Sequence, residues 1–383
     1  MLRVLTSNRA VSLQTVAMDI VKVANRLGID AMWHDRPLVP KELKVNGDRA
    51  IVVMAVDVLN SMTWFLFARD YTKAGIRNVF YGPIEGRVNR QFIQYWMREI
   101  TYAAVSNYVR ERLLEAGFRV IDVVPHGIDL RQVLEVKRMG LTMEKYLSDH
   151  GLDPRKHFIV LTIANSHPRK GLAWYDKVIS IVEKKDPSVK FLVITEDRGL
   201  NYFGQHQNLV VTTDFGRLPR QSVLALIGSI HVLALPSLSE GFGLPVLEAM
   251  TVGTPCVHAS LPPIMEFSTG FVVPVRDVVY FDKEVIGPSG ILFEQHLYEV
   301  SEFADVLLQV IDLWKNKKEA IIDWRAKAWE RALQYDIYKV YPKLLRYVVP
   351  VMEETIEEKV EAYDFSKLPP TPETSPQVVT QSV

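Results

Sequence analysis

Residues 230–255 combine an apolar run, a glycine-rich loop with two carboxylates and a helix-forming run. The run 230–235 is typical of a buried strand, while 246–252 favours a helix that stops at Gly253 and Pro255. Between them stands Glu-Gly-Phe-Gly-Leu-Pro at residues 240–245. This order predicts a strand, a loop at its carboxyl end and a helix, which is where open α/β sheets bind ligands.

The loop has the chemistry of an anion-binding site. The N–H groups of Phe242, Gly243 and Leu244 come just before the helix, at the positive end of its dipole. Gly241 and Gly243 allow the backbone to approach a ligand closely and to adopt a positive φ. Pro245 suits the first helical position, because an N–H there would have no helical partner. We expect the loop to hold a phosphate or a polarised sugar oxygen.

Two carboxylates belong to this unit, Glu240 in the loop and Glu248 in the opening turns of the helix. Two acceptors at this spacing could hold hydroxyl groups on two different parts of one ligand. The residues alone equally allow a structural interpretation, in which Glu248 complements the helix dipole and the glycines only form a turn.

The pattern P-S-x-x-E-G-F-G-L-P-x-L-E-A-M-x-x-G-x-P around Glu240 and Glu248 resembles the E-x(7)-E signature of the family-4 retaining glycosyltransferases. The resemblance implies an α/β fold of two Rossmann-like domains with a deep cleft between them, the GT-B architecture. It implies transfer of a hexose from a nucleotide-sugar, with Glu248 on the ribose hydroxyls and Glu240 on a hydroxyl of the donor sugar. It implies no cofactor, because the nucleotide-sugar is itself a substrate, and no metal is expected in this architecture.

A basic turn, Arg169 and Lys170, follows a predicted strand and precedes a predicted helix. Such a turn suits a diphosphate, since Lys supplies a compact charge and Arg a bidentate fork, although a solvated loop has the same composition. Lys170 also matches the family's phosphate-binding Lys. The Arg that members commonly carry about six residues earlier is replaced by Ala164. We expect Lys170, Arg169 and the loop amides to stabilise the negative charge of the departing diphosphate.

The acceptor side is less well specified. Residues 78–86 contain no His, although many family members place a cleft-facing His there. The turn 124–129 resembles the family's P-N-G-[VI]-D turn with His in place of Asn, and Asp129 is expected to cap a helix. Candidates for the acceptor side are Tyr81, Glu85, Arg9 and His126.

Apolar runs alternate with helical patterns in both halves of the chain, which predicts parallel sheets covered by helices. Predicted strands are 4–7, 50–55, 79–81, 102–105, 120–124, 158–164, 189–195, 209–212 and 232–235; predicted helices are 13–27, 58–74, 108–116, 171–184 and 220–227, with 303–347 mostly helical. We therefore predict four parts: an acceptor-binding Rossmann-like domain (1–150), a nucleotide-sugar-binding Rossmann-like domain (151–325), a helix that crosses back to the first domain (326–351), as the resemblance implies, and an acidic, Pro-rich disordered tail (352–383).

Composition narrows the partners. Lys+Arg and Asp+Glu are equal at 45 each, so no basic field indicates nucleic acid as a partner. No run of eighteen apolar residues occurs, and the single cysteine, Cys256, fits a reducing compartment. We expect a cytoplasmic protein whose contact with a membrane is at most peripheral.

Several alternatives stay open. The acceptor could be a carbohydrate, a lipid-linked molecule or another small molecule, and the donor sugar and its base are not specified. The chain could also be a related GT-B epimerase or phosphorylase. A non-catalytic nucleotide-sugar-binding protein would agree with the missing Arg and His.

Overall fold

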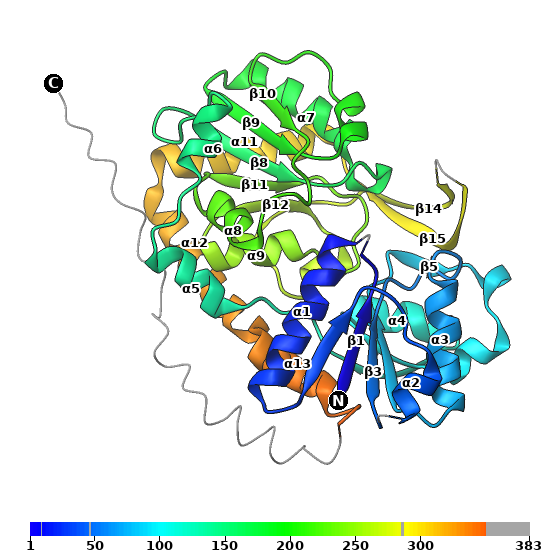
Figure 1. The fold of residues 1–383 in the computed structure, drawn as a ribbon. Coiled ribbons are helices and arrows are strands. Elements are labelled where there is room, and N and C mark those ends of the chain that lie inside the picture. The colour runs from blue at the N-terminus through cyan, green and yellow to red at the C-terminus, as the bar shows by residue number, and fades with distance from the viewer. Residues whose placement is uncertain (9, 46, 285–286, 350–383) are drawn as a thin grey trace.

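The computed structural model describes residues 1–8, 10–45, 47–284 and 287–349. Arg9 and the predicted tail at 352–383 lie outside the described residues. The described part is an α/β structure with two six-stranded parallel sheets, each covered by helices (Figure 1). The predicted fold class, two Rossmann-like domains, is confirmed.

The first sheet has the strand order β2-β1-β3-β4-β6-β7, with every pairing parallel. Its central strands are almost entirely buried, as expected for parallel strands with helices on both faces. The strands of this sheet are β1 (Leu2–Thr6), β2 (Ala31–His34), β3 (Arg49–Val53), β4 (Asn78–Gly82), β6 (Thr101–Ala104) and β7 (Arg119–Val123). The helices of the domain are α1 (Val11–Arg26), α2 (Pro40–Val45), α3 (Met62–Lys73) and α4 (Asn107–Glu115), with 3-10 turns η1 (Arg90–Phe92) and η2 (Tyr95–Glu99).

The second sheet has the order β10-β9-β8-β11-β12-β13, again with every pairing parallel. Its strands are β8 (Phe158–Ile163), β9 (Val189–Ile194), β10 (Leu209–Thr212), β11 (Val232–Leu235), β12 (Cys256–Ala259) and β13 (Phe271–Val273). Its helices are α7 (Leu172–Lys185), α8 (Arg220–Gly228), α9 (Leu244–Val252), α10 (Pro262–Met265) and α11 (Val300–Asn316), with 3-10 turns η3 (Pro168–Lys170) and η4 (Asp197–Tyr202). The carboxyl ends of β8 and β11 carry the basic turn and the glycine loop, so these two features meet at one edge of the sheet.

A third, smaller sheet joins the two domains. The hairpin β14 (Asp277–Glu284) and β15 (Gly287–Leu297) belongs to the second half of the chain, and β5 (Gly86–Val88) belongs to the first. β5 pairs antiparallel with β15, with Gly86 opposite Phe293 and Val88 opposite Ile291. The domains therefore share a continuous ladder of hydrogen bonds on this side (Figure 1).

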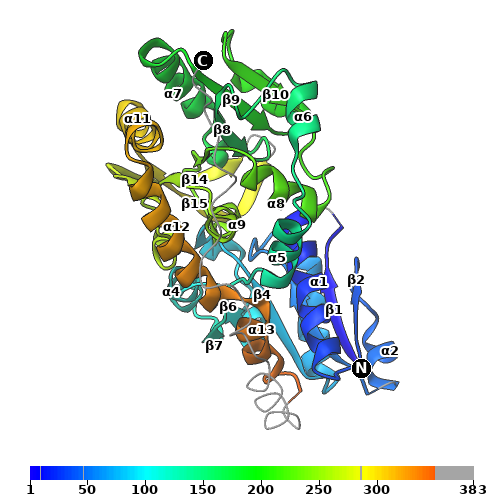
Figure 2. The same cartoon turned by 90° about the vertical axis from the view of Figure 1, so that its left-hand side faces the viewer.

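The chain crosses between the domains twice, and the two crossings run side by side. The first leads into α5 (Leu130–Arg138) and α6 (Glu144–Asp149); the second follows α12 (Lys318–Ala332) through η5 (Leu333–Tyr335) into α13 (Ile337–Leu345). The Ile128 N–H donates to Tyr335 O at 2.8 Å, and the Ile337 N–H donates to Ile128 O at 3.2 Å. Asp129 caps α5, as predicted. In Figure 2 the orange helices run from one domain to the other along one side of the molecule.

Several boundaries differ from the sequence predictions. The predicted strands are present with ends shifted by at most two residues, but the predicted helix 58–74 begins at Met62. The Asp57 carboxylate accepts hydrogen bonds from the N–H groups of Leu59 and Asn60, which favours a turn in place of the first helical turn. The range 326–351 contains the end of α12, η5 and α13; α12 packs against α9 and α13 against α1. Strands β2, β5 and β12–β15 were not predicted.

None of the helices in the described residues is both long enough and apolar enough to cross a membrane.

The paired crossings lead to a prediction about Gly127. A Cβ on Gly127 would lie 2.7 Å from Val340 Cγ2 and 3.0 Å from Tyr335 O. We expect Gly127→Ala to lower the free energy of unfolding by about 1–3 kcal/mol, because the crossings must separate to accept the methyl group. Gly204→Ala is the control, since the nearest atom to its Cβ would be 3.9 Å away. Denaturant unfolding of both variants checks this, and equal effects would contradict it.

Candidate functional site

The glycine loop joins β11 to α9 and leaves the helix start without a side-chain cap. Gly243 is the N-cap residue with φ +98°, and a Cβ there would lie 2.7 Å from Ile264 Cγ1, so only glycine fits. Helix α9 begins at Leu244, so Pro245 is the second helical residue. The sequence analysis predicted it to be the first. Proline is tolerated at either place, because the first helical N–H groups have no acceptor within the helix. The amide-lined helix start is therefore present as expected.

Lys170 and Glu240 form a largely buried ion pair at the centre of the site. Lys170 Nζ lies 2.5 Å from Glu240 Oε1, and Ser237 Oγ donates to the same oxygen at 2.7 Å. Although burial acts to raise the pKa of Glu240, Lys170 and Arg169 hold it below its ordinary value. Burial, with Arg169 alongside, lowers the pKa of Lys170. The structure thus brings together two residues that the sequence placed 70 positions apart.

The basic turn packs backbone to backbone against the strand end that precedes the glycine loop. Gly171 has φ +68°, and a Cβ there would lie 2.1 Å from Pro236 O. The Leu238 N–H donates to Arg169 O at 2.8 Å. The turn and the loop are therefore held at a fixed separation, which sets the position of Lys170 relative to Glu240.

Arg169 reaches the first domain. Its Nε lies 2.7 Å from Glu85 Oε2, and its Nη1 donates to Ser239 O at 3.3 Å. Burial raises the pKa of Glu85, even though Arg169 and Lys170 act to lower it. Glu85, predicted on the acceptor side, therefore lies within the cluster of charges formed by Arg169, Lys170 and Glu240.

Glu248 makes an ion pair that the sequence analysis missed. Its Oε1 contacts Nη1 of Arg220, the first residue of α8. Although burial acts to lower the pKa of Arg220, the Glu248 carboxylate raises it. Arg220 also acts on a carboxyl group of the first domain, Asp19 on α1. Burial raises the pKa of Asp19 to about 7, although the positive charge of Arg220 acts to lower it. Pairing between α8 and α9 has no local sequence signal, because the two residues are 28 positions apart.

Two other acceptor-side candidates, Tyr81 and His126, are not at an open surface. Tyr81 is 0% exposed and His126 is 2% exposed, and the Tyr81 hydroxyl lies 2.9 Å from His126 Nδ1. The His126 ring stands edge-on to Phe242 at 5.2 Å, and burial lowers its pKa to about 3, so it is neutral. An acceptor contact by either ring would require this packing to change. His126 thus packs the domain crossing against Phe242 of the glycine loop, and Tyr81 contacts His126 from the first domain.

Two further positions from the sequence analysis are Ala164 and Arg9. Ala164, which the resemblance places where family members commonly carry an Arg, is 3% exposed and directly follows β8. Arg9 lies outside the described residues, so its predicted contact stays a prediction.

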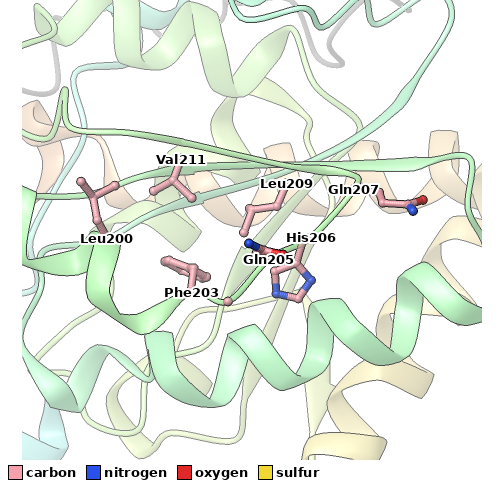
Figure 3. Close-up of a pocket in the computed structure, with 8 residues that line it drawn as sticks. Leu200, Phe203, Gln205, His206, Gln207, Leu209 and Val211 are labelled. Carbon is pink, nitrogen blue, oxygen red and sulfur yellow. The ribbon is translucent and has the colours of Figure 1, made fainter.

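A cavity of about 640 Å³ lies elsewhere, between η4 and β10 of the second domain (Figure 3). Leu200, Phe203, His206, Leu209 and Val211 are among its lining residues. None of the eight lining residues belongs to the glycine loop or the basic turn. The charged cluster at the sheet edge, and not this cavity, is the candidate site.

His206 has a structural explanation. Its Nε2 lies 2.7 Å from Asp176 Oδ1 and its Nδ1 lies 2.9 Å from Glu183 Oε2. Both carboxylates belong to α7, so the imidazole fastens the segment before β10 to that helix. Although burial acts to lower the pKa of His206, these two partners raise it.

Comparison with known proteins agrees with the geometry of the second domain. Residues 157–288 match the family model described as Glycosyl transferases group 1. "Uncharacterized glycosyltransferase 335" of Sulfolobus islandicus rod-shaped virus 1 is 24% identical over 355 residues, covering 89% of this chain and 98% of that protein. The chain is an enzyme, a glycosyltransferase.

Solved structures support the fold over most of the chain. The trehalose-6-phosphate synthase OtsA superposes with a TM-score of 0.66 at 12% identity, covering 91% of this glycosyltransferase and 98% of that chain. Alr3699/HepE of Anabaena, in complex with UDP and glucose, gives a TM-score of 0.63 at 12% identity, covering 91% and 99%. At this identity the likeness establishes the two-domain fold alone.

The packing of the basic turn gives a second prediction. Gly171→Ala adds a clash with Pro236 O to the strain of a positive φ. Gly151→Ala is a matched control, because Gly151 has φ +72° with no atom within 4 Å of its Cβ. We expect the control to cost about 1–2 kcal/mol of unfolding free energy from φ alone. Gly171→Ala should cost about 1–3 kcal/mol more from overpacking. Chemical denaturation measures both, and equal costs would contradict the close packing.

The third prediction is a pH dependence carried by His206. Because its folded-state pKa lies above the ordinary 6.5, protonated His206 stabilises the fold at lower pH, and this contribution is lost as the pH rises through the folded value. We expect the loss of unfolding free energy in His206→Gln to be larger at about pH 5.5 than at about pH 8.5. Urea unfolding at the two pH values tests this. A loss that does not change with pH would contradict it.

Proposed function

We propose that the chain is a retaining glycosyltransferase of the family-4 type, which moves a hexose from a nucleotide-sugar to an acceptor. The observation that carries the proposal is the buried Lys170–Glu240 pair beside the uncapped start of α9. A cation and free amides suit the diphosphate of a donor, and a carboxylate 2.5 Å from that cation suits a sugar hydroxyl.

The donor would lie across the edge of the second sheet. Lys170 and Arg169, with the amides of Phe242, Gly243 and Leu244, would stabilise the negative charge that builds on the departing diphosphate. Glu240 would accept a hydrogen bond from a hydroxyl of the transferred sugar, whose transition state is oxocarbenium-like. The backbone that carries these groups is preorganised, since the turn and the loop are fixed by backbone contacts.

Glu248 would hold the ribose hydroxyls of the nucleotide. In the structure one of its oxygens contacts Arg220, which leaves the second oxygen to accept hydrogen bonds. Arg220 would then fix the carboxylate in place, as a positioning residue.

The acceptor would bind from the first domain, opposite the donor. Glu85 is the candidate nearest to the charged cluster, through its contact with Arg169. We infer a carbohydrate, a lipid-linked molecule or another small molecule as acceptor. UDP-sugars are the first donors to test, because the HepE structure contains UDP and glucose. We further propose that the protein works in the cytoplasm, with at most a peripheral membrane contact.

A second candidate, a non-catalytic nucleotide-sugar-binding protein, is favoured by Ala164 in place of the usual Arg. Incubation with a panel of UDP-, GDP- and ADP-sugars separates the two candidates. Slow release of free nucleotide supports the transferase, whereas binding without turnover supports the binding protein. Proton NMR of the first sugar released tests the stereochemistry: retention predicts the α-anomer from an α-linked donor, and the β-anomer would contradict it.

The fourth prediction concerns Glu240. We expect Glu240→Gln to lower kcat for donor turnover by about 100-fold or more, because the amide cannot supply the negative charge beside the developing cation. Binding of the free nucleotide should remain, since the nucleotide contacts Glu248 and not Glu240. Glu302→Gln is the control, a solvent-accessible carboxylate of the same domain that pairs with Arg276.

Thermal unfolding accompanies the kinetic measurement for both variants. If Glu240→Gln lost cooperative unfolding together with nucleotide binding, the carboxylate would be structural and the assignment would be wrong.

A further inference from the structure

The segment 83–85 of the first domain lies directly on the candidate donor site. A Cβ on Gly241 would be only 2.3 Å from Pro83 Cβ, so the Gly241 backbone packs closely on the Pro83 ring. Ser239 Oγ donates to Glu85 O at 2.7 Å, and the Glu294 N–H donates to the same oxygen at 3.1 Å. The second domain therefore holds the backbone of Glu85 from two sides.

The two cations of the basic turn each face a carboxylate, but the two carboxylates are held differently. Glu240 comes from the same domain as Lys170 and also accepts a hydrogen bond from Ser237. Glu85 comes from the opposite domain, and the structure places its Oε2 against Arg169 Nε at 2.7 Å. The pKa of Glu240 is lowered whereas burial raises that of Glu85, which agrees with a weaker stabilisation of the Glu85 charge.

Arg169 has little room for a second anion while Glu85 is present. The Arg169 side chain is 12% exposed, and its Nη1 already donates to Ser239 O. Carboxylates and phosphates compete for a guanidinium, because both offer paired oxygens to the same N–H groups.

We propose that Glu85 occupies the place of a donor phosphate on Arg169 in the unliganded protein, and that the diphosphate of the donor displaces it. This inference rests on the proposed function, since it requires a diphosphate at the basic turn. Glu85 then acts as a gate on the donor site and is not a catalytic residue.

The displacement needs only a side-chain rotation. The backbone of Glu85 stays bonded to Ser239 and Glu294, and the ladder of β5 with β15 starts at the next residue, Gly86. Once displaced, the Glu85 carboxylate is free to accept a hydrogen bond from an acceptor hydroxyl.

The test is a calorimetric titration of the purified full chain with UDP, GDP and ADP, and with the matching nucleosides. We expect Glu85→Gln to bind the preferred nucleoside diphosphate about threefold to tenfold more tightly than wild type. Affinity for the nucleoside, which has no phosphate, should stay unchanged. Glu99→Gln, an exposed carboxylate of the same domain, serves as the control and should bind like wild type.

A double-mutant cycle assigns the gain to the ion pair. In an Arg169→Ala background, Glu85→Gln should no longer change the affinity for the diphosphate. If Glu85→Gln does not fold, Glu85→Asp, whose shorter side chain loses the 2.7 Å contact, should show a smaller gain.

The outcomes separate the inference from the proposed function. Wild type that binds a nucleoside diphosphate, with no gain in Glu85→Gln, overturns the inference alone. If wild type, Glu85→Gln and Glu99→Gln all fail to bind any of the three diphosphates, the proposed function is overturned and the inference with it. A gain that persists without Arg169 also overturns the inference.

Discussion

The largely buried ammonium of Lys170 and the carboxylate of Glu240 stabilise each other's charge. Lys170 and Glu240 come from turns that follow different strands, and each side chain would be costly to bury alone. Their meeting requires that β8 and β11 be neighbours in a parallel sheet, so that their carboxyl ends lie at the same edge. It also requires the turn and the strand end to pack backbone to backbone at Gly171. The topology of the second domain is thus what makes the site possible.

Much of this could be predicted from the sequence, because the signals are local. Short apolar runs such as 158–163 and 232–235 mark buried parallel strands, and glycines mark the places where the backbone needs a positive φ. Strands with mixed or short patterns were missed: β5 has only three residues, and its partner β15 lies about 200 positions later. The helix start at Met62 was misplaced, since an Asp57 turn competes with the first helical turn.

The candidate site divides in the same way. The loop, Lys170 and Glu240 form a recognisable pattern, whereas Arg220 on Glu248 and Glu85 on Arg169 are pairings between distant elements. Charged residues on helices and turns are common, and nothing local distinguishes those that find a buried partner. For Tyr81 and His126 the sequence favoured a position facing the cleft, whereas in the structure both rings are buried by packing.

The shared ladder of β5 and β15 has a consequence for how the chain can be divided. If the second domain were produced alone, residues 86–88 would be missing and the edge of β15 would be left with unpaired N–H and C=O groups. Exposed strand edges of this kind recruit strands from other molecules, which leads to aggregation. Although each domain has its own sheet, the short strand from the first half thus covers an edge that the second half would expose if it were produced alone.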